Sequence, residues 1–194
     1  MKRILCFGGF TQTDKMMENT LRGLKSQYKK EFIFDILPGP YVLPDGISRA
    51  WYVYSKEKPL EVDWAALNSQ KEKKDLISLD DSFTYAMKAL EGATYSIILG
   101  FSQGAAFLSL LAMHTDLSQY KLIFVGGFLP IKITTYKPKF KYKTMHIMGK
   151  ADDIIKEAWS NVLASCFEDP ILLTHKYRHI IPRIPKTLIN TLLT

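Results

Sequence analysis

The sequence contains only two cysteines and four histidines in 194 residues, so few side chains are available for metal binding or disulfide formation. Cys6 and Cys166 belong neither to a CxxC pair nor to a Cys/His ligand spacing. This pattern argues against a structural zinc site and against a disulfide framework. We therefore expect a reducing, cytoplasmic setting.

The sequence also lacks a long apolar run. The first one, ILCF at residues 4–7, ends at Gly8 and is too short for the core of a signal peptide. No run approaches the roughly 20 apolar residues that cross a bilayer, so we expect a soluble protein without a transmembrane segment. With 47% hydrophobic residues and no internal repeat, residues 1–194 are long enough for one sizeable core. This favours a single domain.

Acidic residues are scarce in the last third of the chain. The net charge is +7, and residues 131–194 hold eleven lysines and arginines against five acidic residues. In the densest basic segment, 132–143, lysines alternate with aromatic residues. Such a segment can dock on nucleic acid or on an anionic membrane, whereas lysines in a loop or an edge strand can simply prevent aggregation. Because no nucleic-acid-binding motif accompanies it, we expect no specific nucleic-acid partner.

Short apolar runs alternate with amphipathic helical patterns along most of the sequence. The runs are apolar throughout, which predicts strands covered on both faces, as in a parallel sheet wrapped by helices. We therefore predict an α/β fold with a mainly parallel sheet of about six strands and helices on both faces. Strands are predicted at 3–9, 31–40, 95–100, 121–127, 143–149 and 171–175, and helices at 14–30, 79–90, 103–113, 153–167 and 185–193.

Residues 41–78 break this alternation. They include proline, glycine, tryptophan and the lysine-rich stretch KEKKD, without a clear strand and helix. A segment of this length without regular elements is usually functional in a compact domain. We interpret it as an irregular insertion or a lid.

The stretch GFSQG at residues 100–104 joins a predicted strand to a predicted helix. In this setting Gly-x-Ser-x-Gly forms a nucleophile elbow, a strained turn that projects the serine hydroxyl beyond the sheet. The alternative is a simple tight turn around a small residue, because the bare motif also occurs by chance. The flanking strand and helix favour Ser102 as a nucleophile.

A serine nucleophile needs a histidine base, which follows the serine in this fold. His114 lies on the helix that starts at the elbow and cannot reach back, and His146 lies inside a predicted strand, where a core histidine is expected. His175 and His179 both follow or end the last strand. We prefer His179, because its loop can bring the side chain to the carboxyl edge of the sheet.

The acid that orients the base should follow the preceding strand, 143–149. Asp152 and Asp153 both occupy this position, and either could bind Nδ1 of His179. The alternative role is helix capping, since an aspartate at a helix start accepts free backbone N–H groups. One residue of the pair can cap while the other serves in catalysis.

An oxyanion hole needs two N–H donors near the serine. The backbone N–H of Gln103 lies at the predicted helix start, where the helix dipole favours negative charge. The loop CFGGFTQ after the first strand can present the N–H of Phe10; nucleotide binding is the weaker alternative, because no GxGxxG or P-loop lysine follows. Apolar side chains that could form an acyl pocket, or alternatively only core, are Phe101, Trp51, Phe128 and Leu129.

Four segments together resemble one family. They are ILCFGGFTQT (4–13), SRAWYVYSKE (48–57), IILGFSQGAA (97–106), and MGKADDII (148–155) followed by HKYRHIIP (175–182). In this order and spacing they resemble the fungal-type family of serine hydrolases, small α/β-hydrolases related to the ovarian-cancer-associated serine hydrolase. RAWY is the most discriminating part, because generic esterases share the elbow but not this motif.

The resemblance implies the α/β-hydrolase fold and a site in which Ser102 is the nucleophile, Asp152 the acid and His179 the base, with oxyanion donors at Phe10 and Gln103. It also implies a small-molecule ester or thioester substrate, without metal or organic cofactor, and leaves the oligomeric state open.

The sequence departs from the family pattern at two places. Gly8 stands where relatives usually have histidine, and Lys176, Tyr177 and Arg178 stand where relatives tend to have glycines. The alternative function is therefore a catalytically impaired hydrolase-fold binding protein that docks on anionic partners through the basic segment 132–143.

Overall fold

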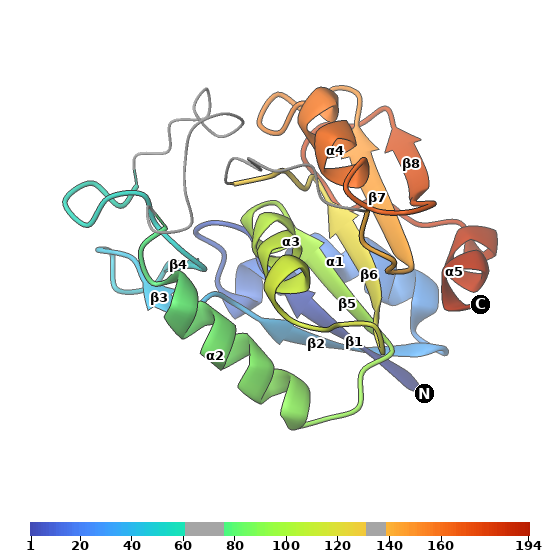
Figure 1. Cartoon of the computed structure of the whole chain (residues 1–194), viewed down its shortest axis with the longest axis horizontal. Coiled ribbons are helices and arrows are strands. Elements are labelled where there is room, and N and C mark those ends of the chain that lie inside the picture. Colours follow the sequence, from blue (N-terminus) through green and yellow to red (C-terminus); the bar gives the residue numbers. More distant parts are fainter. Residues whose placement is uncertain (61–75, 131–138) are drawn as a thin grey trace.

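The computed structural model describes residues 1–60, 76–130 and 139–194. A six-stranded parallel sheet with the order β2-β1-β5-β6-β7-β8 runs through it (Figure 1). The prediction of an α/β-hydrolase fold with a mainly parallel sheet of about six strands is confirmed. The strands are β1 (Lys2–Phe7), β2 (Phe32–Leu37), β5 (Ile97–Phe101), β6 (Lys121–Val125), β7 (Thr144–Gly149) and β8 (Ile171–His175).

Helices cover both faces of this sheet, because successive side chains of a strand point to opposite faces. In β1, Ile4 and Cys6 pack in one core with α1 and α5, whereas Leu5 and Phe7 pack in the other with α2, α3 and α4. Two-sided burial explains why the strands are apolar at nearly every position. The helices are α1 (Asp14–Tyr28), α2 (Leu79–Glu91), α3 (Gln103–His114), α4 (Glu157–Ala164) and α5 (Lys186–Leu193).

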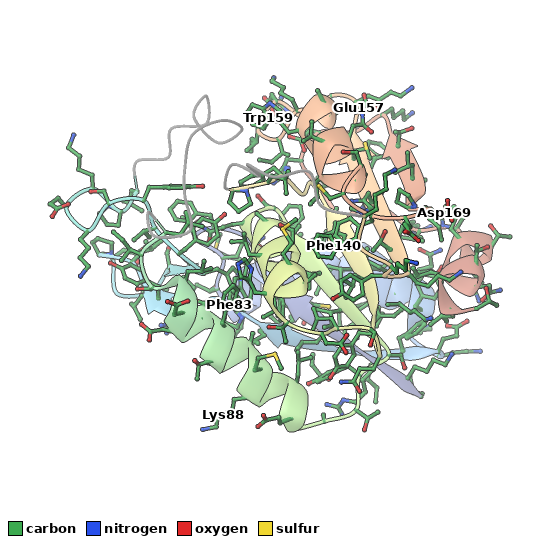
Figure 2. All side chains as sticks on the ribbon, in the orientation of Figure 1. Phe83, Lys88, Phe140, Glu157, Trp159 and Asp169 are labelled. Atoms are coloured by element: carbon green, nitrogen blue, oxygen red, sulfur yellow. The ribbon has the colours of Figure 1, made fainter. Side chains whose placement is uncertain are left out.

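Helix α3 carries the elbow residues at its start and is buried over its first ten residues. Phe83 of α2 lies against it (Figure 2), with its ring centroid 5.7 Å from that of Phe107. A helix that is apolar on all sides needs such cover, here the sheet on one side and α2 on another. The beginning of α3 is therefore held firmly by its neighbours.

The predicted helix at 153–167 differs from the structure at both ends. Helix α4 spans only Glu157–Ala164. Before it, Oδ1 of Asp152 accepts the N–H groups of Ile154 and Ile155, each at 2.9 Å. The side chain thus directs these N–H groups into a turn, which delays the helix.

Part of the segment predicted as an insertion or lid, 41–78, forms regular structure. Strands β3 (Tyr41–Val42) and β4 (Arg49–Ala50) pair in a small antiparallel sheet, and Trp51 directly after them is fully buried. Residues 61–75 lie outside the described residues, so the role of a lid stays a prediction.

The basic segment 132–143 is described only from residue 139 onward, since 131–138 lie outside the described residues. Lys139, Lys141 and Lys143 are exposed, while Phe140 and Tyr142 pack against the ring of Phe167. The docking of this segment on anionic partners stays a prediction. Within the part of the chain that the structure describes, the helices are too short or too polar to cross a bilayer.

Candidate active site

Ser102 occupies the turn between β5 and α3. Its backbone has φ 53° and ψ −118°, a conformation that residues other than glycine rarely adopt, and its N–H donates to the carbonyl of Val125 at 2.8 Å. Strain of this kind costs about 1–3 kcal/mol and persists only where the surroundings enforce it. The turn has the geometry expected of a nucleophile elbow.

Gly104, the second glycine of the elbow, lets α3 start in direct contact with the end of β1. A Cβ placed on Gly104 would lie 2.4 Å from the carbonyl oxygen of Phe7 and 2.5 Å from that of Gly8. A side chain at residue 104 would therefore push the elbow away from the loop that follows β1.

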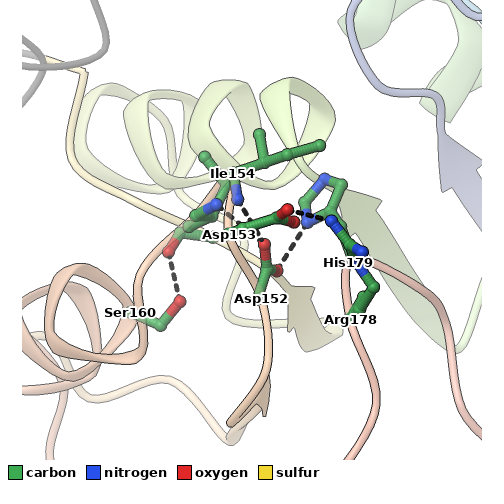
Figure 3. A network of polar contacts seen from close by, with 8 residues as sticks. Asp152, Asp153, Ile154, Ser160, Arg178 and His179 are labelled. Carbon is green, nitrogen blue, oxygen red and sulfur yellow. Dashed lines mark hydrogen bonds and ion pairs between the residues drawn. The ribbon is translucent and has the colours of Figure 1, made fainter.

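His179 and Asp152 form a hydrogen-bonded pair in the loops after β8 and β7 (Figure 3). Nδ1 of His179 lies 2.6 Å from Oδ2 of Asp152, and the carboxylate is almost fully buried. Burial alone would raise the pKa of Asp152, but the hydrogen bonds from His179 and from the N–H groups of Ile155 and Ile154 outweigh it and lower the pKa. The carboxylate therefore stays ionised at neutral pH beside the imidazole.

Asp153 points elsewhere. Its carboxylate forms an exposed ion pair with Arg178 (Figure 3). Asp152 performs both of the roles expected for the two aspartates, orienting the histidine and accepting free backbone N–H groups. One of its carboxylate oxygens binds His179, and the other accepts the N–H groups in the turn before α4.

Ser102 and His179 line the same cavity, of about 590 Å³. The imidazole packs on the ring of Phe101, with centroids 4.7 Å apart. Asn19 and Thr20 of α1 contribute neutral polar groups to the wall, and the described lining holds no Lys, Arg, Asp or Glu. Its apolar members are Phe10, Met16, Phe101, Ile154, Ile180 and Ile181.

The predicted oxyanion donor Gln103 directly follows Ser102 at the start of α3, and the predicted donor Phe10 follows Gly9 in the loop after β1. A Cβ placed on Gly9 would lie 3.3 Å from Cβ of Ser102, so the loop before Phe10 touches the elbow. Among the described residues, no acceptor takes the backbone N–H of Phe10 or of Gln103, whereas the N–H of Gly9 donates to the Gln12 side chain at 2.8 Å. The role of these two N–H groups as oxyanion donors stays a prediction.

Three of the four predicted acyl-pocket residues lie in the core. Trp51 stacks on Phe107, Phe128 packs with the cluster around Ile155, and Leu129 belongs to the core under α3, whereas Phe101 lines the cavity. Substrate contact by Trp51, Phe128 and Leu129 stays a prediction.

The other histidines lie outside the described lining of the cavity. His146 is buried in β7 and stacks on Phe124, and burial lowers its pKa to about 3, so it is neutral. His175 ends β8, and Nδ1 of His114 lies 2.8 Å from the carbonyl of Leu110 within α3. Across residues 1–60, 76–130 and 139–194, no three His, Cys, Asp or Glu side chains form a group that could bind a metal ion.

Gly126, which is not among the predicted site residues, leaves the space that the His179–Asp152 pair occupies. Gly126 follows β6 with φ +56°, and a Cβ placed on it would lie 2.8 Å from Cε1 of His179 and 3.7 Å from Oδ2 of Asp152. The carbonyl of Gly127, the residue after Gly126, accepts a hydrogen bond from the Ser160 hydroxyl of α4 at 2.7 Å. The signal was the glycine pair at the end of the apolar run KLIFVGG, which parallels the pair after β1.

Known proteins that resemble this chain in sequence or fold include serine hydrolases and esterases. The family model described as serine hydrolase (FSH1) matches residues 1–189. An esterase of Caenorhabditis elegans is 27% identical over 201 residues, covering 95% of this chain and 88% of its own, and the human esterase OVCA2 is 27% identical over 203 residues, covering 93% and 89%. The crystal structure of a carboxylesterase from Mesorhizobium loti shares the fold, with a TM-score of 0.65 at 17% identity over 99% of this chain and 88% of that one. Since the family model spans nearly the whole sequence, the chain belongs to the FSH1 serine hydrolase family, an enzyme family with esterases among its members.

Proposed function

We propose that this enzyme cleaves carboxylic esters or thioesters through an acyl-enzyme on Ser102, with His179 as the base and Asp152 as the acid that orients it. The observation that carries the proposal is the 2.6 Å contact between Asp152 and His179 beside a cavity that Ser102 and His179 both line. An ionised carboxylate on Nδ1 fixes the tautomer in which Nε2 can accept a proton.

In the proposed reaction, Nε2 of His179 takes the hydroxyl proton of Ser102 while Oγ attacks the carbonyl carbon. The carbonyl oxygen becomes negative and accepts hydrogen bonds from the N–H groups of Phe10 and Gln103. The tetrahedral intermediate then collapses, and the imidazolium gives its proton to the leaving alcohol or thiol. A water molecule, deprotonated by the same imidazole, releases the acyl group as a carboxylic acid and restores Ser102.

The cavity supports a small, uncharged substrate. Its described lining is apolar or neutral, and its volume of about 590 Å³ falls in the usual range for small-molecule sites. A formal charge on the acyl chain would lose its hydration there without gaining an ionic partner from the described lining.

A fluorophosphonate probe tests the proposal directly. The native protein is expected to form a stable adduct that peptide mass spectrometry assigns to Ser102, and to hydrolyse p-nitrophenyl acetate, with an initial burst of p-nitrophenol if deacylation is the slower step. Heat-unfolded protein serves as the control, because an unactivated serine is a poor nucleophile. Failure of the native protein to react at Ser102 would instead favour the catalytically impaired binding protein.

Gly126→Ala tests how closely the His179–Asp152 pair depends on the backbone after β6. The new methyl group would overlap the imidazole, so kcat for p-nitrophenyl acetate is expected to fall by about 100-fold, the effect of moving a catalytic group by about 1 Å. Steady-state kinetics and thermal unfolding of the same samples measure the effect.

Gly46→Ala is the matched control for Gly126→Ala. Gly46 also has a positive φ, +74°, but a Cβ there would meet nothing within 4 Å. Both variants carry the backbone strain of an alanine at positive φ, and only one crowds the imidazole. Equal activities of the two variants would contradict the prediction.

A further inference from the structure

The Trp51–Tyr52 segment contacts both sides of the proposed oxyanion hole. Building on the proposed function, we infer that Trp51 is a positioning residue, which together with the Gln103 side chain fixes the two backbone N–H donors relative to one another. Trp51 is fully buried and lies outside the described lining of the cavity, so this role differs from substrate contact.

The first link joins this segment to the donor on the elbow. Oε1 of Gln103 accepts the backbone N–H of Trp51, and Nε2 of Gln103 donates to the carbonyl of Tyr52, both at 2.9 Å. A primary amide has one acceptor oxygen and two donor hydrogens, so both ends of this group are engaged by the backbone of two adjacent residues. The residue that carries one oxyanion donor is thereby fastened to residues 51 and 52.

The second link joins the same segment to the donor on the loop after β1. The indole Nε1–H of Trp51 donates to the carbonyl of Gly8 at 2.8 Å. The N–H of that same peptide group, on Gly9, donates to Oε1 of Gln12, also at 2.8 Å. The peptide plane between Gly8 and Gly9 is thus held at both ends.

The adjoining peptide plane carries the proposed donor. Its carbonyl, on Gly9, accepts the backbone N–H of Gln12 at 3.2 Å, and its N–H belongs to Phe10. The two peptide planes meet at the Cα atom of Gly9. Hydrogen bonds on the Gly8–Gly9 plane and on the Gly9 carbonyl together limit rotation at this atom and so restrict the direction of the Phe10 N–H. Trp51 therefore acts on Phe10 through one intervening peptide group.

The indole itself has little freedom to move. Its ring lies 4.1 Å from that of Phe107, nearly parallel at 10°, and 4.8 Å from that of Phe7. Gly8 has no side chain of its own with which to support the loop. A rigid indole between the strand end and α3 is well suited to supply that support.

A residue that holds the two oxyanion donors in place, as proposed for Trp51, affects catalysis more than substrate binding. Oxyanion donors are effective only when they are already aligned with the position of the developing charge, and a substrate in its ground state gains little from that alignment. Loosening one donor should therefore lower kcat and leave KM nearly unchanged.

Trp51→Phe tests the inference, because phenylalanine keeps an aromatic ring beside Phe107 and removes the Nε1–H. We expect kcat for p-nitrophenyl acetate to fall by about tenfold, part of the loss caused by removing an oxyanion donor outright, with KM changed by less than about twofold. The affinity of a phenylboronic acid, which forms a tetrahedral adduct on the serine, should fall by the same factor as kcat.

Tyr142→Phe is the matched control for the loss of an aromatic hydrogen-bond donor. The Tyr142 hydroxyl donates to the carbonyl of Ala112 at 3.1 Å, at the end of α3 remote from Ser102. This variant should lose stability but retain the kcat and the boronate affinity of the wild type. If circular dichroism shows Trp51→Phe to be unfolded, Gln12→Met, which releases the other end of the same peptide, should show the loss of kcat and of boronate affinity.

The outcomes separate this inference from the proposed function. If the wild type reacts at Ser102 but Trp51→Phe keeps its kcat, or shifts only KM, the positioning role is wrong and the hydrolase mechanism stands. An equal loss of kcat in Tyr142→Phe would also overturn it, because the effect would then follow from stability alone. A wild type that neither turns over nor reacts with fluorophosphonate would overturn the proposed function and this inference together.

Discussion

Replacing Ser102 with alanine is expected to lower kcat for p-nitrophenyl acetate by about 10⁶-fold, because the attacking oxygen is removed while the rest of the site stays in place. Alanine carries the same backbone strain at φ 53° as serine does, and the side chain is small and buried, so the fold should be retained. Residual turnover above the rate in water would come from the oxyanion donors and from binding alone. Steady-state kinetics at high enzyme concentration, with thermal unfolding as a check of the fold, measure the effect.

Ser109→Ala is the matched control on the same helix. Ser109 is also buried in α3, and its hydroxyl donates to the carbonyl of Ala106 at 2.6 Å. This variant removes a serine hydroxyl without touching the elbow, so its kcat should equal that of the wild type. If Ser102→Ala kept activity within about tenfold of the wild type, hydrolysis would have to proceed without an acyl-enzyme on Ser102, for example by water that His179 activates directly.

Much of the fold is predictable because two-sided burial leaves a local signature. Every position of β7 is buried and apolar or small except His146, and a run of this kind between turn residues is typical of a central parallel strand. The start of α4 is harder to predict, since the turn before it depends on the Asp152 side chain, which competes for backbone N–H groups. The apolar periodicity of the sequence gives no information on whether a side chain or the helix binds these N–H groups.

The elbow is predictable because its pattern also lies within a short stretch of sequence. The residues that hold the site in place, such as Trp51, are not predictable in this way. Strand, turn and helix around Ser102 are contiguous in the sequence, so their pattern can be recognised in one short window. The bonds of Trp51 reach residues 43 and 52 positions away, at Gly8 and Gln103. The sequence shows the size and apolarity of the tryptophan in RAWY, which fit a pocket wall or a core position alike, and it does not show the hydrogen bonds of that residue.

Asp152 and Asp153 illustrate the limit of spacing arguments. Both follow β7 within the reach of a loop, and only the direction of each side chain after the turn distinguishes them. That direction depends on partners far along the chain, Arg178 for one residue and His179 for the other. The two aspartates nevertheless allow a well-controlled experiment, because they are adjacent and chemically identical and each can be replaced in turn.

Asp152→Asn is expected to lower kcat by about 10⁴-fold, since the amide can no longer hold the imidazole in the productive tautomer. An asparagine NH₂ that donates to Nδ1 of His179 favours the tautomer with a proton on Nε2, and that nitrogen then cannot accept the proton of Ser102. The amide oxygen can still accept the N–H groups of Ile154 and Ile155, so the turn before α4 should persist. Steady-state kinetics measure the loss, and fluorophosphonate reactivity at Ser102 should fall with it, because the same proton transfer activates the serine.

Asp153→Asn is the control, and it removes the same charge one residue away. The Asp153 carboxylate is about half exposed and pairs with the exposed Arg178, and an ion pair of this kind contributes only about 0–1 kcal/mol to stability. Its kcat should therefore stay within about twofold of the wild type, since the imidazole keeps its partner. Equal losses in the two variants would mean that the local negative charge matters rather than the bond to His179. A nearly normal Asp152→Asn beside a strongly impaired Asp153→Asn would exchange the roles of the two aspartates, and the orientation of His179 would then have to come from a loop arrangement different from the one in Figure 3.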